Sequence, residues 1–218
     1  MNQLDQTRRE FLKRSSIALA TLPLLIGCSG DTLAIANPSD ILAKLKRNAK
    51  AAGTEGMGAI EVPNNVTWRT AFKTTKDDGE PMIISGTVFK SDGKTPAPNT
   101  LIYFYHTDKN GIYGRGSQPR HGRYRGWMLT DARGRYEFAS IRPASYPNST
   151  QSQHVHMSIT TLDAREDWYD SILFEGDSLI TDRERRSAGE RGGFNPIVRL
   201  ERGSDGIMRA GRDIQVMS

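Results

Sequence analysis

Thiols are almost absent from this chain of 218 residues, which has a single cysteine, Cys28. One cysteine cannot form an intramolecular disulfide, and a metal site with several thiolate ligands is excluded as well. The chain also lacks a basic run interleaved with aromatic residues, and its net charge of +5 shrinks without the basic N-terminal segment. Nucleic-acid binding therefore has no support. A Ser-His-Asp arrangement, a phosphate-binding loop and a dinucleotide-binding pattern are missing too.

Apolar runs are short, and the stretch at residues 17–27 cannot span a bilayer as a permanent helix. It follows Thr7-Arg8-Arg9-Glu10-Phe11-Leu12-Lys13, which has the form of a twin-arginine export signal. The run ends in Leu25-Ile26-Gly27-Cys28, which has the form of a bacterial lipobox. We therefore expect residues 1–27 to be a signal peptide and Cys28 to carry lipid. The mature protein would then be a periplasmic or cell-envelope lipoprotein that meets the membrane only through this lipid. The alternative is a cytosolic protein with a frayed basic N-terminus.

Short strands and turns dominate the rest of the chain. Gly- and Asp-containing turns separate runs of β-branched and aromatic residues at 82–89, 100–105, 126–130, 135–138 and 155–160. This spacing predicts an all-β fold, a β-sandwich of mixed and antiparallel strands. Closing strands are expected at residues 194–200 and 212–216, and a solvated face or loop is expected at 182–191.

A short N-terminal helix is expected at residues 38–46, where Pro38-Ser39-Asp40 precedes an apolar-periodic segment. Its apolar positions are too few to form a core alone. The sequence thus predicts three parts: the signal peptide, residues 28–65 with the lipidated cysteine, a tether and the helix, and the sandwich at residues 66–218.

The histidines of Gln153-His154-Val155-His156-Met157 are the strongest indication of chemistry. Residues i and i+2 of an extended strand point to the same face, about 6–7 Å apart along the backbone, which is near enough to bind one metal ion. Tyr113 and Tyr146 lie upstream and carry phenol oxygens. Oxygen and nitrogen donors without a thiol suit a hard, oxidised metal.

An ordered set of motifs resembles the core of the intradiol ring-cleavage dioxygenases, the family that contains protocatechuate and catechol dioxygenases. The set comprises Gly-x-Tyr at 111–113, Thr-Asp-x-x-Gly-x-Tyr at 130–136, Tyr-Pro at 146–147 and His-x-His at 154–156. The resemblance covers roughly residues 82–160. It implies a non-haem Fe3+ ion held by Tyr113, Tyr146, His154 and His156. It also implies that Tyr146 leaves the metal when substrate binds, and that O2 cleaves a small aromatic diol between its hydroxyl-bearing carbons to give a muconate-type diacid.

One position departs from the family pattern. The family has Arg-Pro-Ala shortly before His-x-His, and its arginine helps to stabilise the activated substrate. Gln151-Ser152-Gln153 occupies this stretch, so Gln151 stands where a catalytic cation is expected. A neutral amide hydrogen-bonds a catecholate but supplies no charge. Arg123, Arg125 and Arg142 are candidates to replace that charge from neighbouring loops.

Other interpretations remain open. A non-catalytic sandwich of the carboxypeptidase-regulatory or transthyretin-like kind, acting as a binding module on the cell envelope, would share the hairpin motif. Two histidines also suit a zinc hydrolase, although its third ligand and general base are not evident. Of the other histidines, His106 is expected to be a hydrogen-bonded structural residue and His121 a loop residue near the pocket.

Overall fold

The computed structural model describes residues 37–50, 58–72, 78–114 and 121–217. The predicted signal peptide, Cys28 and the predicted tether lie outside these ranges, so export, lipidation and the domain boundaries stay predictions. The chain divides into residues 1–35 and a unit that runs from Ala36 to Ser218, and the description below concerns the second unit. None of its described helices has the length and apolar character needed to cross a membrane.

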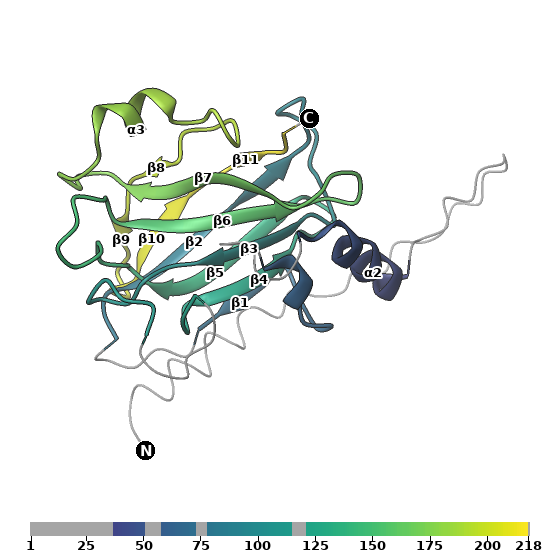
Figure 1. Ribbon diagram of the computed structural model, residues 1–218, viewed down its shortest axis with the longest axis horizontal. Helices are drawn as coiled ribbons and strands as arrows, with labels where there is room; N and C mark the ends of the chain where they lie inside the picture. Colours follow the sequence, from purple (N-terminus) through teal and green to yellow (C-terminus); the bar gives the residue numbers. More distant parts are fainter. Residues whose placement is uncertain (1–36, 51–57, 73–77, 115–120, 218) are drawn as a thin grey trace, which may run out of the picture. The chain divides into compact units, whose positions relative to one another are not determined.

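Strands account for most of the described secondary structure (Figure 1). In chain order the elements are α2 (Pro38–Asn48), the 3-10 helix η1 (Ala59–Glu61), β1 (Arg69–Ala71), β2 (Pro81–Phe89), β3 (Leu101–Tyr105), β4 (Arg125–Leu129), β5 (Arg135–Ile141), β6 (His154–Thr160), β7 (Asp167–Phe174), α3 (Asp182–Ser187), β8 (Ile197–Val198), β9 (Glu201–Arg202), β10 (Met208–Gly211) and β11 (Ile214–Gln215). The predicted all-β class with one short N-terminal helix is confirmed.

Two mixed sheets make up the fold. One has the order β1-β5-β2-β10-β9, with β11 also paired to β2, and the other has the order β4-β3-β6-β7-β8. Most neighbours are antiparallel, whereas β1 with β5, β10 and β11 with β2, and β8 with β7 are parallel. The C-terminal strands β10 and β11 therefore complete the first sheet by pairing with β2.

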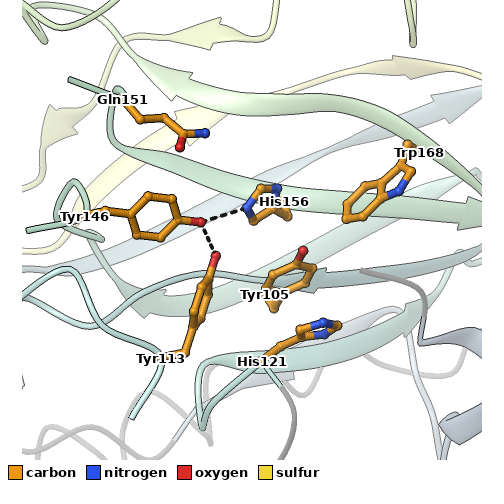
Figure 2. Close-up of a pocket in the computed structure, with 7 residues that line it drawn as sticks. All are labelled: Tyr105, Tyr113, His121, Tyr146, Gln151, His156 and Trp168. Carbon is orange, nitrogen blue, oxygen red and sulfur yellow. Dashed lines mark hydrogen bonds between the residues drawn. The ribbon is translucent and has the colours of Figure 1, made fainter. Parts of the chain in front are cut away.

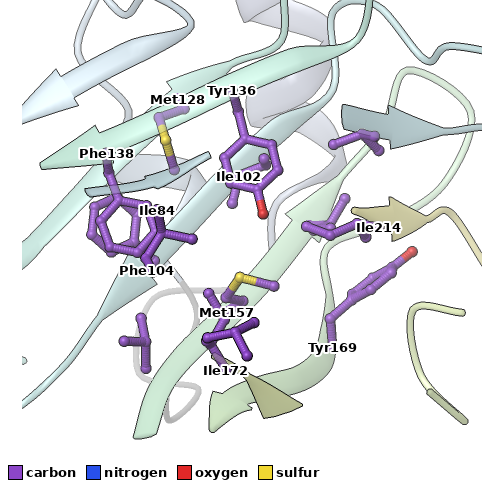
Figure 3. Close-up of a cluster of buried hydrophobic side chains, with 14 of the residues drawn as sticks. Ile84, Ile102, Phe104, Met128, Tyr136, Phe138, Met157, Tyr169, Ile172 and Ile214 are labelled. Atoms are coloured by element: carbon purple, nitrogen blue, oxygen red, sulfur yellow. The ribbon is translucent and has the colours of Figure 1, made fainter. Parts of the chain in front are cut away.

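A continuous hydrophobic core joins the two sheets (Figure 3). Phe104 of β3 stacks on Phe138 of β5, with ring centroids 4.1 Å apart. Met82 and Ile84 from one sheet and Met157 from the other are fully buried in the same cluster. Removing this apolar surface from water, at about 25 cal/mol per Å², is the main driving force for the sandwich.

Strand β6 shows how the core defines the site, because its side chains alternate between two faces. Val155, Met157 and Ile159 belong to the core between the sheets. His154 and His156, at the other parity, therefore lie on the outer face of the second sheet. At the other end of this face, α2 and η1 cover β3, with Leu45 packed in a cluster that includes Leu101.

Sequence reasoning missed one long strand, β7, and several short elements, namely η1, β1, α3, β9 and β10. Strand β7 carries Asp167 and Asp170 among its apolar residues, and they leave it without a simple alternating pattern. Both carboxylates find partners about 20 residues further along the chain, since Asp170 accepts hydrogen bonds from the backbone N–H groups of Gly189 and Arg191 and Asp167 pairs with Arg191. Helix α3 lies within the segment expected to be a solvated face or loop, and its residues are indeed not buried. Its start is fixed by a capping box between Thr181 and Glu184.

Candidate metal centre

Donor atoms of the four predicted ligands converge at one point, and Figure 2 shows three of these residues, Tyr113, Tyr146 and His156. The hydroxyl oxygens of Tyr113 and Tyr146 lie 2.6 Å apart. The Tyr146 oxygen is 3.2 Å from Nε2 of His154 and 3.3 Å from Nε2 of His156. The two Nε2 atoms are 2.9 Å apart. Residues separated by up to 43 positions in the sequence thus present two oxygens and two nitrogens to a common centre.

The two tyrosines meet because their loops are bound to each other. The carboxylate of Asp108 accepts hydrogen bonds from the backbone N–H groups two and four residues later, which folds the turn before Tyr113. Gly111 in this turn has φ +77°, and a Cβ there would lie 1.9 Å from the carbonyl oxygen of Ser145. Only glycine permits this close approach. The turn is thereby held against the segment that carries Tyr146.

The ring of His154 is oriented by the segment that enters its strand. Its Nδ1 lies 2.7 Å from the carbonyl oxygen of Ser152, and a carbonyl only accepts, so Nδ1 carries the proton. Nε2 is then the nitrogen available as a ligand. The Ser152 hydroxyl donates to the Glu184 carboxylate at 2.8 Å, which ties this strand entrance to α3. A β-bulge in the pairing of β6 with β7 lies between Val155 and Met157, at the level of His156.

Burial keeps both histidines neutral. It lowers the pKa of His154, against a smaller opposing effect of the hydrogen bond to Ser152. Burial also lowers the pKa of His156 to about 3, and the neighbouring imidazoles add to this decrease. A neutral imidazole is the form that binds metals. The pair is therefore ready to act as ligands at neutral pH without losing protons.

The geometry of the four donors fits a single metal ion. Two ligands bound at about 2.1 Å and at right angles to each other lie about 3.0 Å apart, close to the separations of the donor atoms here. Two phenols that ionise on binding would offset two positive charges, and the imidazoles add neutral nitrogen. This set suits iron better than a soft metal. Within the described part of the chain, no three His, Cys, Asp or Glu side chains gather into an alternative site.

A cavity of about 670 Å³ opens beside these donors. Three of the ligands border it, and the other lining residues are Tyr105, His121, Gln151 and Trp168 (Figure 2). Gln151 thus reaches the site, as its position before His-x-His predicts. The cavity provides room for a small organic molecule next to the metal ligands.

The three arginines considered as substitutes for a cation have other partners. Arg123 pairs with Asp78, Arg125 with Glu61, and Arg142 with Gln153 and Glu80. None of the three is among the described residues that line the cavity. Gln151 therefore remains the side chain at the position where the sequence leads us to expect a cation.

Both remaining histidines behave as expected. His106 is buried, with Nδ1 2.7 Å from the Thr107 carbonyl oxygen and Nε2 2.8 Å from the Ser140 hydroxyl, which makes it a structural residue. His121 follows β3 at a distance of 16 residues and borders the cavity.

Sequence reasoning missed Tyr105 and Trp168 as walls of the cavity. Tyr105 stacks on His156 at 4.6 Å between ring centroids, and Trp168 packs against the same ring at 5.7 Å. The alternation of side chains along β3 could have indicated Tyr105. Its neighbour Phe104 faces the core, so Tyr105 faces the outer side of the sheet, where the histidines lie. Trp168 gave no such signal, since β7 was not predicted.

Comparison with protein families matches residues 61–193 to the family described as Dioxygenase. Among curated proteins, the protocatechuate 3,4-dioxygenase beta chain of Burkholderia cepacia is 29% identical over 148 residues, which cover 61% of this chain and 59% of the relative. Catechol 1,2-dioxygenase 1 of Acinetobacter lwoffii is 30% identical over 162 residues, covering 61% of this chain and 51% of the relative. The chain thus spans between half and three fifths of these relatives.

Solved structures show the same fold. Catechol 1,2-dioxygenase from Acinetobacter sp. ADP1 superimposes with a TM-score of 0.54 at 19% identity, over 70% of this chain and 57% of that one. The dioxygenase domain of a dioxygenase carbohydrate-binding protein fusion from Streptomyces sp. SirexAA-E gives a TM-score of 0.52 at 18% identity, over 77% and 96% of the two chains.

Proposed function

Because this chain belongs to the intradiol ring-cleavage dioxygenase family, we propose that it is a non-haem Fe3+ enzyme that cleaves a catechol-type ring with O2. Cleavage falls between the two hydroxyl-bearing carbons and gives a muconate-type diacid. The observation that carries this proposal is the convergence of Tyr113, Tyr146, His154 and His156 beside a cavity. A non-catalytic sandwich would have no use for such a set of donors.

Tyr113, Tyr146, His154 and His156 would hold the iron. Bound Fe3+ would supply the Lewis acidity that ionises the phenols and activates the aromatic diol toward O2. His154 and His156 contribute neutral nitrogen, and the carbonyl of Ser152 keeps Nε2 of His154 directed at the centre. The protein's own contribution is to place these donors and to exclude other ligands from them.

Tyr146 is the residue we assign to proton transfer. It lies on a loop rather than a strand, and its oxygen contacts the other three donors. As a phenolate it is a base that accepts a proton from one hydroxyl of the incoming diol at its Oη atom. Movement of a loop side chain costs little, whereas the two strand histidines are fixed by their ladder.

Gln151 is assigned to substrate stabilisation. Its side chain is exposed at the cavity, where its amide offers hydrogen bonds to an anionic diol. A hydrogen bond from a neutral donor stabilises a developing charge less than one from a guanidinium. We therefore expect a slower reaction than an arginine in the same place would give.

The proposed location is the cell envelope. The twin-arginine pattern and the sequence before Cys28 support export of a folded, metal-loaded protein that is then lipidated. Metabolic labelling with a radioactive fatty acid tests this, with Cys28→Ala as the unlabelled control. Labelling of both proteins, or of neither, would argue against lipidation at this residue.

Oxygen uptake by the iron-loaded protein tests the enzymatic proposal. The panel contains catechol, hydroxyquinol and protocatechuate, and mass spectrometry identifies each product. For at least one of these catechols, we expect one O2 to be consumed per molecule of substrate, and both atoms of that O2 to be found in the diacid product. Iron-loaded protein without visible colour and without turnover of any member would refute the proposal.

A further inference from the structure

The indole of Trp168 forms part of the cavity wall next to a proposed metal ligand (Figure 2). Its ring packs against that of His156, with centroids 5.7 Å apart and planes at 61°. Tyr105 packs on the same imidazole at 4.6 Å, and its ring lies 6.2 Å from that of Trp168. Two aromatic side chains, from β7 and β3, thus flank His156 and border the space beside the donor atoms.

The backbone of Trp168 is held by side chains and by its sheet. Its carbonyl oxygen accepts two hydrogen bonds from the Arg191 guanidinium, from Nε at 3.0 Å and from Nη2 at 2.8 Å. The carboxylate of Asp167 accepts from the Trp168 N–H at 2.9 Å and pairs with both Arg191 and Lys50. Strand pairing places Trp168 opposite Ser158 of β6. The indole therefore extends from a fixed backbone, and a ligand that packs on it meets a wall that is already ordered.

Trp168 presents a surface to the cavity rather than a structural hydrogen bond. Among the described residues, no atom accepts a hydrogen bond from its Nε1, whereas Nε1 of Trp127 donates to the Gly58 carbonyl at 2.8 Å. Buried tryptophans usually find such a partner. Trp168 is only partly buried and borders the cavity, so part of its flat surface is open to a ligand.

The cavity is larger than an unsubstituted aromatic diol. Its volume is about 670 Å³, whereas catechol, with a van der Waals volume of about 100 Å³, would fill only about 135 Å³ at the packing density of a protein interior. A substituent at ring position 4 points away from the two diol oxygens and therefore into the space beyond the donor atoms. Figure 2 shows Tyr146 and Trp168 on opposite sides of His156, so the indole borders that space.

We propose that Trp168 is a specificity-determining residue whose indole packs against an aromatic substituent of the diol, so that aryl-substituted catechols are the preferred substrates. This inference rests on the proposed function and names the substrate class of the same site. Edge-to-face or offset packing of two aromatic rings contributes beyond the burial of apolar area, and a saturated ring of equal size does not gain this contribution. Tyr105 adds aromatic surface on the adjoining wall.

Two substrates of nearly equal size test this preference. We would compare 4-phenylcatechol, which carries a flat ring, with 4-cyclohexylcatechol, which carries a saturated one. The iron-loaded wild-type protein should favour the phenyl compound in kcat/KM. Trp168→Leu keeps an apolar side chain but removes the aromatic ring, and it should reduce the ratio of the two kcat/KM values about fivefold. Comparison of this ratio between proteins cancels the difference in intrinsic reactivity of the two compounds.

Trp168→Phe and Trp68→Leu serve as matched variants. Trp168→Phe retains a smaller ring on the same backbone, so its ratio should lie between those of the wild-type protein and Trp168→Leu. Trp68 is another partly buried tryptophan, but its ring contacts Arg69 and Arg135 and it is not among the described lining residues. Its replacement by leucine should leave the ratio unchanged.

A purely structural role of Trp168 would give a different result. If the indole only supported the ring of His156, Trp168→Leu would weaken iron binding and lower kcat/KM for both compounds by the same factor. Iron content and both kcat/KM values are therefore measured for each variant. A ratio that stays at the wild-type value in Trp168→Leu and Trp168→Phe, both folded as judged by circular dichroism, overturns the proposal.

Binding measurements without O2 separate this inference from the proposed function. Equilibrium dialysis gives the Kd of each compound, which does not depend on turnover. If neither compound is cleaved but Trp168→Leu still reduces the preference in Kd for 4-phenylcatechol about fivefold, the proposed reaction fails and the recognition role stands. If both compounds are cleaved but the wild-type protein binds them with equal Kd, the recognition role is overturned and the proposed reaction stands. Failure of the wild-type protein to bind 4-phenylcatechol overturns the recognition role as well.

Discussion

The hydroxyl of Ser152 donates a hydrogen bond of 2.8 Å to the carboxylate of Glu184, and this contact joins the entrance of the histidine-bearing strand to helix α3. Ser152 also supplies the carbonyl that orients His154. Glu184 accepts from Thr181 as well, in the capping box that begins α3. A short exposed helix that no sequence argument had linked to the site therefore supports His154, one of the proposed metal ligands.

Ser152→Ala should weaken iron binding about tenfold, at the lower end of the effect seen for groups that orient metal ligands. The serine carbonyl remains, but it loses the tether that fixes its position. Iron affinity is measured by competition with a chelator. Ser187→Ala is a suitable control, since it removes a serine hydroxyl from α3 that donates to the Arg183 carbonyl within the same helix. Equal iron affinities in the two variants would show that the tether is not needed.

Tyr113→Phe and Tyr146→Phe should each bleach or shift the visible absorption of iron-loaded protein, because phenolate-to-iron charge transfer produces that colour. Each variant should also lose most activity. Visible spectra at equal iron content provide the measurement. Tyr124→Phe serves as the control, since its hydroxyl contacts Arg123 and not the four donors. A band unaltered in both ligand variants would exclude the tyrosines as ligands.

Gln151→Arg should raise kcat/KM for the best catechol by about tenfold or more, because a hydrogen bond to a charged group contributes about 1.5–3 kcal/mol. The new guanidinium would border the same cavity. Steady-state kinetics at low ionic strength are the test. Thr150→Arg, at an exposed residue that is not among the described lining residues, adds the same charge next to Gln151 as a control. A rise of equal size in both would indicate general electrostatic attraction, and a fall in Gln151→Arg alone would contradict the assignment.

Gly111→Ala should destabilise the protein and separate the two tyrosine loops. The new Cβ would overlap the Ser145 carbonyl, and φ is +77°. We expect a loss of about 2–4 kcal/mol in the free energy of unfolding, together with weaker iron binding. Gly206→Ala separates the cost of the positive φ from the cost of the steric overlap. Gly206 has φ +78°, and no described atom lies within 4 Å of its Cβ position. The free energy of unfolding of Gly206→Ala, measured by urea denaturation, should decrease by only about 1 kcal/mol.

His106 should make the protein less stable at mildly acidic pH. Burial lowers its pKa from 6.5 to about 4 in the folded protein, so the unfolded chain binds a proton that the folded protein does not between these values. Stability is therefore complete above pH 6.5 and falls by roughly 3 kcal/mol as the pH decreases to 4. His156 acts in the same direction while no metal is bound, because burial lowers its pKa to about 3.

The contribution of His106 to the pH dependence of stability is obtained by comparing the wild-type protein with a His106 variant. His106→Asn removes the titrating group but retains a donor for the Thr107 carbonyl. The slope of unfolding free energy against pH, measured between pH 4 and 6.5 at equal iron content, should be shallower in this variant. Identical slopes would mean that His106 titrates normally in the folded protein.

The four proposed metal ligands could be named from the sequence, because each lies in a short motif of the set that resembles the dioxygenase family. The spacing of His154 and His156 on a strand places both on one face, whatever the rest of the fold does. Tyr113 and Tyr146 were added by the resemblance of the Gly-x-Tyr and Tyr-Pro motifs to the dioxygenase family. The orienting roles of Ser152 and Glu184 depend on contacts across 32 residues, which no local pattern contains.

The wall of the cavity was harder to predict for a related reason. His121 reaches it only because Gly122 packs on the backbone of Tyr113, and Tyr105 only because β3 pairs with β6. The parallel pairing of β10 with β2 joins residues more than 100 positions apart and leaves no periodic signal. Strand β7 was missed because Asp167 and Asp170 are satisfied by partners that only the folded chain provides.

The alternation along β6 has a consequence for how this protein tolerates mutation. Odd-numbered residues from Val155 to Ile159 hold the two sheets together, and the histidines at 154 and 156 are the proposed metal ligands. A saturation library of this strand should therefore show two effects at alternating positions. Substitutions at the odd positions should lower the amount of protein in the cell, whereas substitutions at the two histidines should lower ring-cleavage activity. A shift of one residue in the register of β6 would move the core residues to the outer face and the histidines into the core. Such a shift would therefore destroy both the packing between the sheets and the proposed metal site.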